Sequence, residues 1–141
     1  MSSRDEIAAL IFDYAERLDA GDFDTVAELF AHASYGPAGG PALRGKEAVL
    51  KVLRGLVILY EGIPCTKHVT TNLVVDVDDE ADAAAARAYF TVFQATATLP
   101  LQAIVAGRYE DRFVRVGGKW RFSERVIHMD LQGDLSQHLR R

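Results

Sequence analysis

Three residues at alternate positions of one predicted strand have side chains that could do chemistry. His68, Thr70 and Asn72 lie just before a β-branched run over residues 73–77. Because strand side chains alternate between two faces, a strand that begins at His68 places all three on one face. An imidazole changes protonation near neutral pH, and it acts as a general base when a carboxylate accepts a hydrogen bond from its other nitrogen. The pattern alone fits a polar-lined pocket and a solvated strand edge equally well.

The partner carboxylate indicated by the sequence is Asp19, near the end of the first predicted helix. Ser3 followed by Glu6 resembles a capping box, and apolar residues at helical spacing continue from there to about Ala20. At ~100° per residue, Asp19 lies on the flank of this apolar stripe, roughly 120° from its centre. A flank position suits a solvated helix-end charge as well as a buried pair with an imidazole. Without such a pair, His68 is interpreted more simply as a ring bonded to a backbone carbonyl.

Aromatic and polar residues elsewhere are candidate donors or substrate contacts. Tyr14 lies within the apolar stripe of the first helix, so its ring is expected in the core, where the hydroxyl needs a partner. A buried tyrosine hydroxyl can also polarise a carbonyl or protonate a leaving group, and Tyr35 has the same two interpretations. For Arg125, a salt bridge is the favoured interpretation. The candidate substrate contacts are Tyr35, Asn72, Tyr60, Tyr89 and Arg125.

Helices are predicted first and long strands afterwards. Apolar spacing and end signals predict helices over residues 3–20, 23–30 and 47–60, with Asp22 capping the second. Residues 31–44 are rich in Gly and Pro and predict a loop with room for a short strand around Tyr35. Strands are predicted over residues 68–77, 84–98, 101–116 and 119–129, and Gly117-Gly118 is a strong hairpin signal.

This order of elements indicates an α+β fold. Long strands must twist and bend, so we expect a cone-shaped curved antiparallel sheet wrapped by the three N-terminal helices. Such a cone leaves an interior cavity for a small ligand. In the last strand, alternation places Arg125 and Ser123 on one face and Trp120 and Phe122 on the other. The sequence leaves open which of these faces is inside.

Composition excludes several classes of function. The 141 residues are 49% hydrophobic, which suits one domain over residues 1–141. A net charge of −4 without basic runs argues against nucleic acid, and the chain has no apolar segment long enough to cross a membrane. The absence of a signal-peptide pattern and the single Cys65 favour a cytoplasmic protein. His32 and His138 are expected at the surface, and the scattered histidines and missing phosphate loop indicate neither a metal nor a cofactor.

Several segments carry a resemblance to a known superfamily. They are residues 14–23 (Tyr-Ala-Glu-Arg-Leu-Asp-Ala-Gly-Asp-Phe), 29–31 (Leu-Phe-Ala), 45–48 (Gly-Lys-Glu-Ala), 68–72, 107–109 (Gly-Arg-Tyr) and 120–122 (Trp-Arg-Phe). Through them the chain resembles the SnoaL-like group of the nuclear transport factor two-like superfamily, over nearly its whole length, and this resemblance implies a cystatin-like α+β barrel. The fold hosts enzymes, binding modules and structural subunits.

The enzymes of that superfamily imply roles for particular residues. Scytalone dehydratase, bile-acid dehydratase and hexachlorocyclohexane dehydrochlorinase use a His–Asp pair, and Asp19 and His68 resemble it in position. Tyr14 and Tyr35 resemble pocket tyrosines of the bile-acid and scytalone enzymes. The second strand histidine of the scytalone enzyme has no match, because that stretch offers Tyr89 and Gln94. The loop that carries the base of ketosteroid isomerase reads Ser-Tyr-Gly over residues 34–36, without an aspartate.

The sequence and the resemblance together favour a cofactor-free lyase or isomerase of the dehydratase or cyclase type. Its substrate would be a small apolar organic molecule with a carbonyl group, with His68 as the base, Asp19 as its orienting partner, and Tyr14, Tyr35 and Asn72 as donors. The alternative is a non-catalytic ligand-binding or assembly subunit, like the β-subunit of a ring-hydroxylating dioxygenase. In either case a homodimer or homotrimer is expected, as is common in this superfamily.

Overall fold

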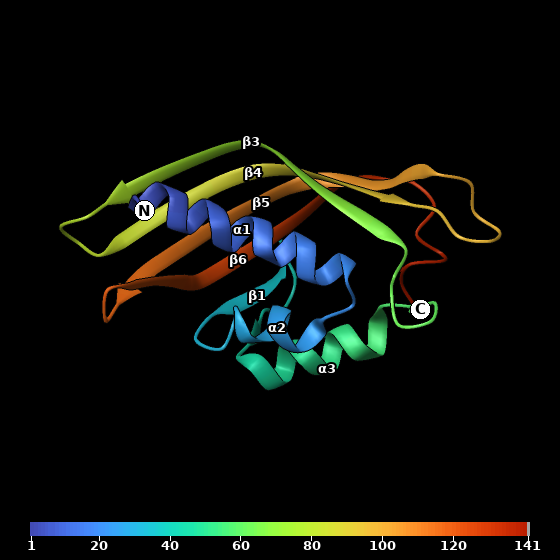
Figure 1. The fold of residues 1–141 in the computed structure, drawn as a ribbon, viewed down its shortest axis with the longest axis horizontal. Coiled ribbons are helices and arrows are strands. Elements are labelled where there is room, and N and C mark those ends of the chain that lie inside the picture. The colour runs from blue at the N-terminus through green and yellow to red at the C-terminus, as the bar shows by residue number, and fades with distance from the viewer. Residues whose placement is uncertain (141) are drawn as a thin grey trace.

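The computed structural model describes residues 1–140, which form three helices and a six-stranded sheet (Figure 1). In chain order the elements are α1 (Ser3–Asp19), α2 (Phe23–Glu28), β1 (Ser34–Pro37), β2 (Leu43–Arg44), α3 (Lys46–Leu56), β3 (Thr66–Asp78), β4 (Ala83–Gln94), β5 (Gln102–Val116) and β6 (Lys119–Gln132). The predicted α+β class is confirmed. The third helix ends at Leu56, earlier than expected, because the next residue, Val57, is extended and bridges Leu139 of the C-terminal tail.

The sheet is curved and unclosed, with the strand order β2-β1-β6-β5-β4-β3. All neighbouring strands are antiparallel except β1 and β6, which are parallel. The helices lie on one face of the sheet, and α1 packs against that face beside β3 (Figure 1). The C-terminal tail returns to the end of α3, close to the start of β3. The core therefore lies between the helices and the inner face of the sheet.

Local signals in the sequence explain where the first two helices begin. Ser2 caps α1 by accepting a hydrogen bond from the Asp5 amide at 3.1 Å, one residue before the predicted capping position. Asp22 caps α2 as predicted, accepting from the Thr25 amide at 3.2 Å. The predicted apolar stripe of α1 is buried, including Tyr14. This orientation leaves Asp19, in the last turn of α1, beside the start of β3.

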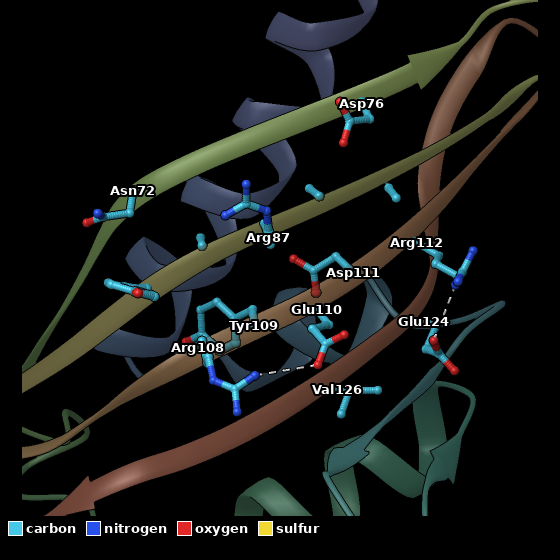
Figure 2. Close-up of a pocket in the computed structure, with 14 residues that line it drawn as sticks. Asn72, Asp76, Arg87, Arg108, Tyr109, Glu110, Asp111, Arg112, Glu124 and Val126 are labelled. Carbon is cyan, nitrogen blue, oxygen red and sulfur yellow. Dashed lines mark ion pairs between the residues drawn. The ribbon is translucent and has the colours of Figure 1, made fainter.

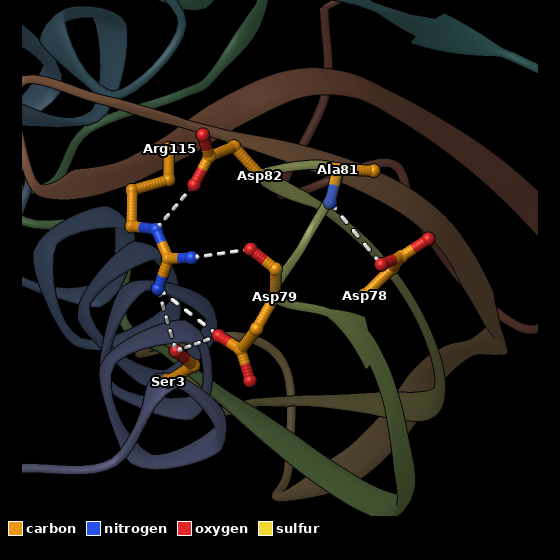
Figure 3. Close-up of polar contacts among 6 residues, drawn as sticks. All are labelled: Ser3, Asp78, Asp79, Ala81, Asp82 and Arg115. Atoms are coloured by element: carbon orange, nitrogen blue, oxygen red, sulfur yellow. Dashed lines mark hydrogen bonds and ion pairs between the residues drawn. The ribbon is translucent and has the colours of Figure 1, made fainter.

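A polar network fixes the opposite end of α1 (Figure 3). Arg115 of β5 donates to Asp82 Oδ1 at 2.8 Å and to Asp79 Oδ1 at 3.0 Å, both in the turn between β3 and β4. The same guanidinium donates to Ser3 Oγ at 3.2 Å, and Ser3 Oγ donates to Asp79. Single exposed ion pairs contribute about 0–1 kcal/mol to stability, so the main effect of this network is to hold these elements in position. It ties the first turn of α1 to β5 and to the turn that begins β4.

Two irregularities in the sheet change which residues face inward. The register of β3 shifts between Thr71 and Val74, and Asn72 has a positive φ of 54°. Inward positions are therefore 66, 68 and 70 before the bulge and 73, 75 and 77 after it. Asn72 is exposed, so the prediction that it shares a face with His68 is wrong.

The second irregularity lies in β6. Phe113 pairs with Phe122 but Arg112 pairs with Glu124, which leaves Ser123 as an extra residue. Phe122 and Arg125 consequently lie on the same, inner face, and both are buried. Strict alternation had separated these two residues, so that part of the sequence prediction is wrong. The sequence left open which face of this strand is inside, and the structure shows that Phe122 and Arg125 both face the core.

Candidate active site

Asp19 and His68 are hydrogen-bonded partners between α1 and β3. The distance from His68 Nδ1 to Asp19 Oδ1 is 2.6 Å, and Asp19 Oδ2 accepts from the His68 backbone amide at 2.8 Å. Thr66, two residues earlier on the same strand face, donates its hydroxyl to Asp19 Oδ1 at 2.8 Å. The side chains of His68 and Asp19 are only 7% and 12% exposed. One helix-end carboxylate is thus held by three donors from a single strand.

These donors fix the charge of Asp19 and the tautomer of His68. Burial by itself would raise the pKa of the Asp19 carboxyl, but the hydrogen bonds from His68 and Thr66 outweigh it, and the pKa lies below its ordinary value. At neutral pH the carboxylate is therefore ionised and can only accept, so Nδ1 of His68 carries the proton. Within residues 1–140, no group hydrogen-bonds Nε2 of His68. In the neutral ring this nitrogen presents a lone pair.

A second imidazole lies beside the first. The rings of His68 and His138 make an edge-on contact with centroids 6.2 Å apart. His138 is 7% exposed, so the prediction that it lies at the surface is wrong. Burial, together with the nearby His68, lowers the pKa of His138 to about 4. At neutral pH this second ring is uncharged.

Three tyrosines and a buried ion pair form the adjacent part of the core. The hydroxyls of Tyr14 and Tyr35 are hydrogen-bonded at 2.7 Å. The ring of Tyr109 lies edge-on to Tyr14, with centroids 5.9 Å apart. Arg125 lies over the rings of Tyr109 and Tyr14 and donates to both carboxylate oxygens of Asp111, at 2.8 and 2.9 Å. The salt bridge favoured for Arg125 is confirmed, and its partner is a fully buried aspartate.

All three tyrosines remain protonated at neutral pH. Burial raises the pKa of Tyr14 above its ordinary value, although the positive charge of Arg125 opposes the rise. Burial raises the pKa of Tyr35 and Tyr109 well above the ordinary value. The negative charge of Asp19 makes a smaller contribution to the raised pKa of Tyr109. The tyrosines are therefore hydrogen-bond donors and not bases.

The other predicted substrate contacts lie elsewhere. The Tyr60 hydroxyl donates to the Gln137 carbonyl at 2.6 Å and so anchors the C-terminal tail. Tyr89 is 55% exposed on the outer face of the sheet, opposite the helices. Asn72 also faces outward. The structure therefore brings together Asp19 and His68 at one place and Tyr14, Tyr35 and Arg125 next to it, while Tyr60, Tyr89 and Asn72 lie outside this group.

A pocket lies on the outer face of the sheet, and it is not the predicted interior cavity (Figure 2). It has a volume of about 520 Å³, and Arg87, Arg108, Arg112, Glu110 and Glu124 are among the charged residues that line it. The other pockets found in residues 1–140 are lined by residues other than His68, Asp19 and Tyr14. The side chains of Asp19 and His68 are mostly buried, and His138 of the C-terminal tail lies beside them.

Several residues of this group were missed by sequence reasoning. Thr66 follows the same two-residue period as His68 and could have been included with it. Tyr109 and Asp111 lie on one face of β5, and an aspartate at an inward strand position is a signal of a buried ion pair. His138 has no comparable signal, because the tail has neither helical nor strand periodicity.

Among residues 1–140, no three His, Cys, Asp or Glu side chains gather in a way that could hold a metal ion. In the same residues, no helix has the length and apolar character needed to cross a membrane.

Solved structures define the class of fold. A nuclear transport factor 2-like protein with a cystatin-like fold from Novosphingobium aromaticivorans is similar with a TM-score of 0.75 and 23% identity, over 90% of this chain and 81% of that one. A candidate scytalone dehydratase from the same bacterium has a TM-score of 0.74 and 26% identity, over 93% and 86%. The protein Aln2 from a Streptomyces species has a TM-score of 0.74 and 26% identity, over 92% and 94%. The fold is therefore of the cystatin-like, nuclear transport factor 2-like kind.

The family within this class follows from the sequence. The family model described as "SnoaL-like domain" matches residues 1–126. The chain belongs to the SnoaL-like domain family, as the resemblance predicted. No curated protein matches the chain.

Proposed function

We propose that this protein is a cofactor-free lyase or isomerase of the dehydratase or cyclase type, acting on a small apolar substrate with a carbonyl group. The observation that carries the proposal is the hydrogen-bonded Asp19–His68 pair. An ionised carboxylate accepts from Nδ1, so Nε2 is left free to accept a proton and the imidazolium that forms is stabilised. The candidate scytalone dehydratase among the similar structures supports this class of reaction.

The proposed reaction begins with proton abstraction next to the carbonyl. In a β-hydroxy ketone, Nε2 of His68 takes the proton from the carbon between the carbonyl and the carbinol. The electron pair of that C–H bond forms an enolate, and its collapse expels the hydroxyl group, which takes the proton from the His68 imidazolium and leaves as water. Tyr14 and Tyr35 keep their protons, and one hydroxyl of the pair is free to donate to an oxygen of the substrate.

The rival proposal is a non-catalytic binding or assembly subunit of the same fold. It is favoured by the burial of Asp19 and His68 and by the pocket on the outer face of the sheet, which other residues line. On this interpretation the pair only ties the end of α1 to the start of β3. Buried hydrogen-bonded carboxylates serve such structural purposes elsewhere.

Dehydration of 4-hydroxy-4-phenylbutan-2-one separates them, because the product is a conjugated enone that absorbs in the near ultraviolet. The wild type is expected to form the enone, and His68→Ala to lose about 10²–10⁴-fold of the rate. Asp19→Asn is expected to lose a smaller part, because the ring keeps its nitrogen but loses the charge that orients it.

The chain offers a matched control. His128 Nε2 lies 2.5 Å from Glu110 Oε1 in a second His–carboxylate pair. Glu110 is exposed, and this pair is not part of the group around Asp19. His128→Ala should turn over the substrate like the wild type. Equal rates in His68→Ala, His128→Ala and the wild type would favour the non-catalytic subunit.

A further inference from the structure

We infer that His138 is part of the same site and that its neutral imidazole donates a hydrogen bond to the carbonyl oxygen of the substrate. The inference rests on the proposed function, because it assigns the electrophile that the His68 base requires. A base that removes a proton next to a carbonyl works best when a donor meets the charge that develops on the oxygen. His138 was expected to be an ordinary surface residue of the tail, but the structure places it against His68.

The first support is an unsatisfied polar atom. Nδ1 of His138 is buried and has no hydrogen-bond partner within residues 1–140. A buried nitrogen without a partner costs free energy and calls for an explanation, of which a ligand is one. Gln94 Oε1, at the same end of the sheet, is also buried without a partner. One atom can donate and the other can accept, which matches the carbonyl and the hydroxyl of a hydroxy ketone.

The second support is the way in which the tail is held. The His138 carbonyl accepts from the Ile58 amide at 2.9 Å, and its amide donates to the Leu135 carbonyl at 3.0 Å. On either side, the Gln137 carbonyl accepts from Gln94 Nε2 at 3.0 Å and the Arg140 amide donates to the Leu56 carbonyl at 2.8 Å. Chain ends usually fray unless they are tied down. Here the hydrogen bonds hold residues 137–140 in place and so fix the ring of His138 beside His68.

The third support is the charge state. With a pKa of about 4, His138 stays neutral at the pH at which His68 works as a base. A neutral imidazole has one N–H to donate, and it does not repel the imidazolium that forms on His68. Neutral imidazole acts as an electrophile beside a carboxylate base in triosephosphate isomerase, so the chemistry has a precedent on an unrelated fold.

The test compares two substitutions at position 138. His138→Phe keeps a ring and removes both nitrogens, whereas His138→Asn places an amide nitrogen near the position of Nδ1. With 4-hydroxy-4-phenylbutan-2-one, His138→Phe should lower kcat by about 10–100-fold with little change in KM, because the bond strengthens in the transition state. His138→Asn should recover the rate to within about threefold of the wild type. His32→Phe, at an exposed histidine, is the matched control and should behave like the wild type.

A second readout does not depend on turnover. The ¹⁵N resonances of the His138 ring are followed while 4-phenylbutan-2-one is added, a ketone that has no hydroxyl group to lose. A shift of the His138 Nδ1 resonance, absent with butylbenzene, supports the contact even if the protein proves to be a binding subunit and the wild type turns nothing over. Wild-type turnover with a fully active His138→Phe overturns the inference and leaves the proposed function standing. A His138→Asn variant as slow as His138→Phe also overturns the inference. The inference is likewise overturned if the His138 ring resonances do not shift when the ketone is added.

Discussion

At the scale of single residues, the site depends on how the oxygens of Asp19 are satisfied. Two donors, the His68 ring and the Thr66 hydroxyl, meet one oxygen, and the His68 amide meets the other. The arrangement keeps the carboxylate charged although burial opposes the charge. Bonds to charged groups contribute about 1.5–3 kcal/mol each, so the same contacts that orient the imidazole also stabilise the fold.

This stabilisation should depend on pH in one direction. The pKa of Asp19 is lower in the folded protein than its ordinary value of 3.8 in the unfolded chain. The contribution is therefore fully present above about pH 4 and is lost as the pH falls through the folded pKa. Asp19→Asn should lower the free energy of unfolding by about 1–3 kcal/mol at pH 6, measured with urea, and the difference from the wild type should shrink below pH 4.

The control for this measurement lies on the same helix. Asp13 forms an exposed ion pair with Arg17, four residues on, at 3.1 Å. Asp13→Asn should change the free energy of unfolding by less than about 0.5 kcal/mol. A gap between wild type and Asp19→Asn that stays constant from pH 6 to pH 3 would show that the charge of Asp19 is not what the donors stabilise.

At the scale of elements, regular stretches were predictable from sequence and irregular ones were not. Helical spacing located α1, and Gly117-Gly118 located the β5–β6 hairpin, with positive φ at both glycines. The bulges at Asn72 and Ser123 could not be predicted, because a register shift depends on the partner strand as much as on the strand itself. They decide that Asn72 faces outward and that Arg125 faces inward.

Another register shift, between β5 and β6, lies at Gly107, where the two strands leave no room for a side chain. A Cβ added at Gly107 would lie 1.8 Å from the His128 carbonyl oxygen and 3.0 Å from a ring carbon of Phe90. Because the nearest atom is backbone, β6 would have to move. Gly107→Ala should therefore lower the free energy of unfolding by about 2–3 kcal/mol in urea.

Gly55 in α3 provides the matched control, because nothing lies within 4 Å of a Cβ added there. Alanine is the better helix former, so Gly55→Ala should leave stability unchanged or raise it by up to about 1 kcal/mol. If both variants unfolded at the same urea concentration as the wild type, β5 and β6 would not approach each other as closely as described.

At the scale of the whole molecule, the sequence predicted the class of fold and the Asp19–His68 contact, but not what encloses it. Both residues of the contact lie in elements with strong local signals. His138 is brought to them by bonds to residues 56–58 and Gln94, far away in the chain, and no local pattern reports such bonds. The predicted homodimer or homotrimer stays a prediction, and the outer sheet face with exposed Tyr89 is the surface where it would form.

The most direct test of the account follows one proton. In D₂O, the wild type should exchange the protons next to the carbonyl of 4-phenylbutan-2-one for deuterium, as observed by proton NMR, because this step needs the base but no leaving group. His68→Ala should exchange no faster than buffer, and His128→Ala should match the wild type. Exchange in the wild type that matches buffer, or that survives in a folded His68→Ala variant, would contradict the claim that the Asp19–His68 pair is a catalytic base.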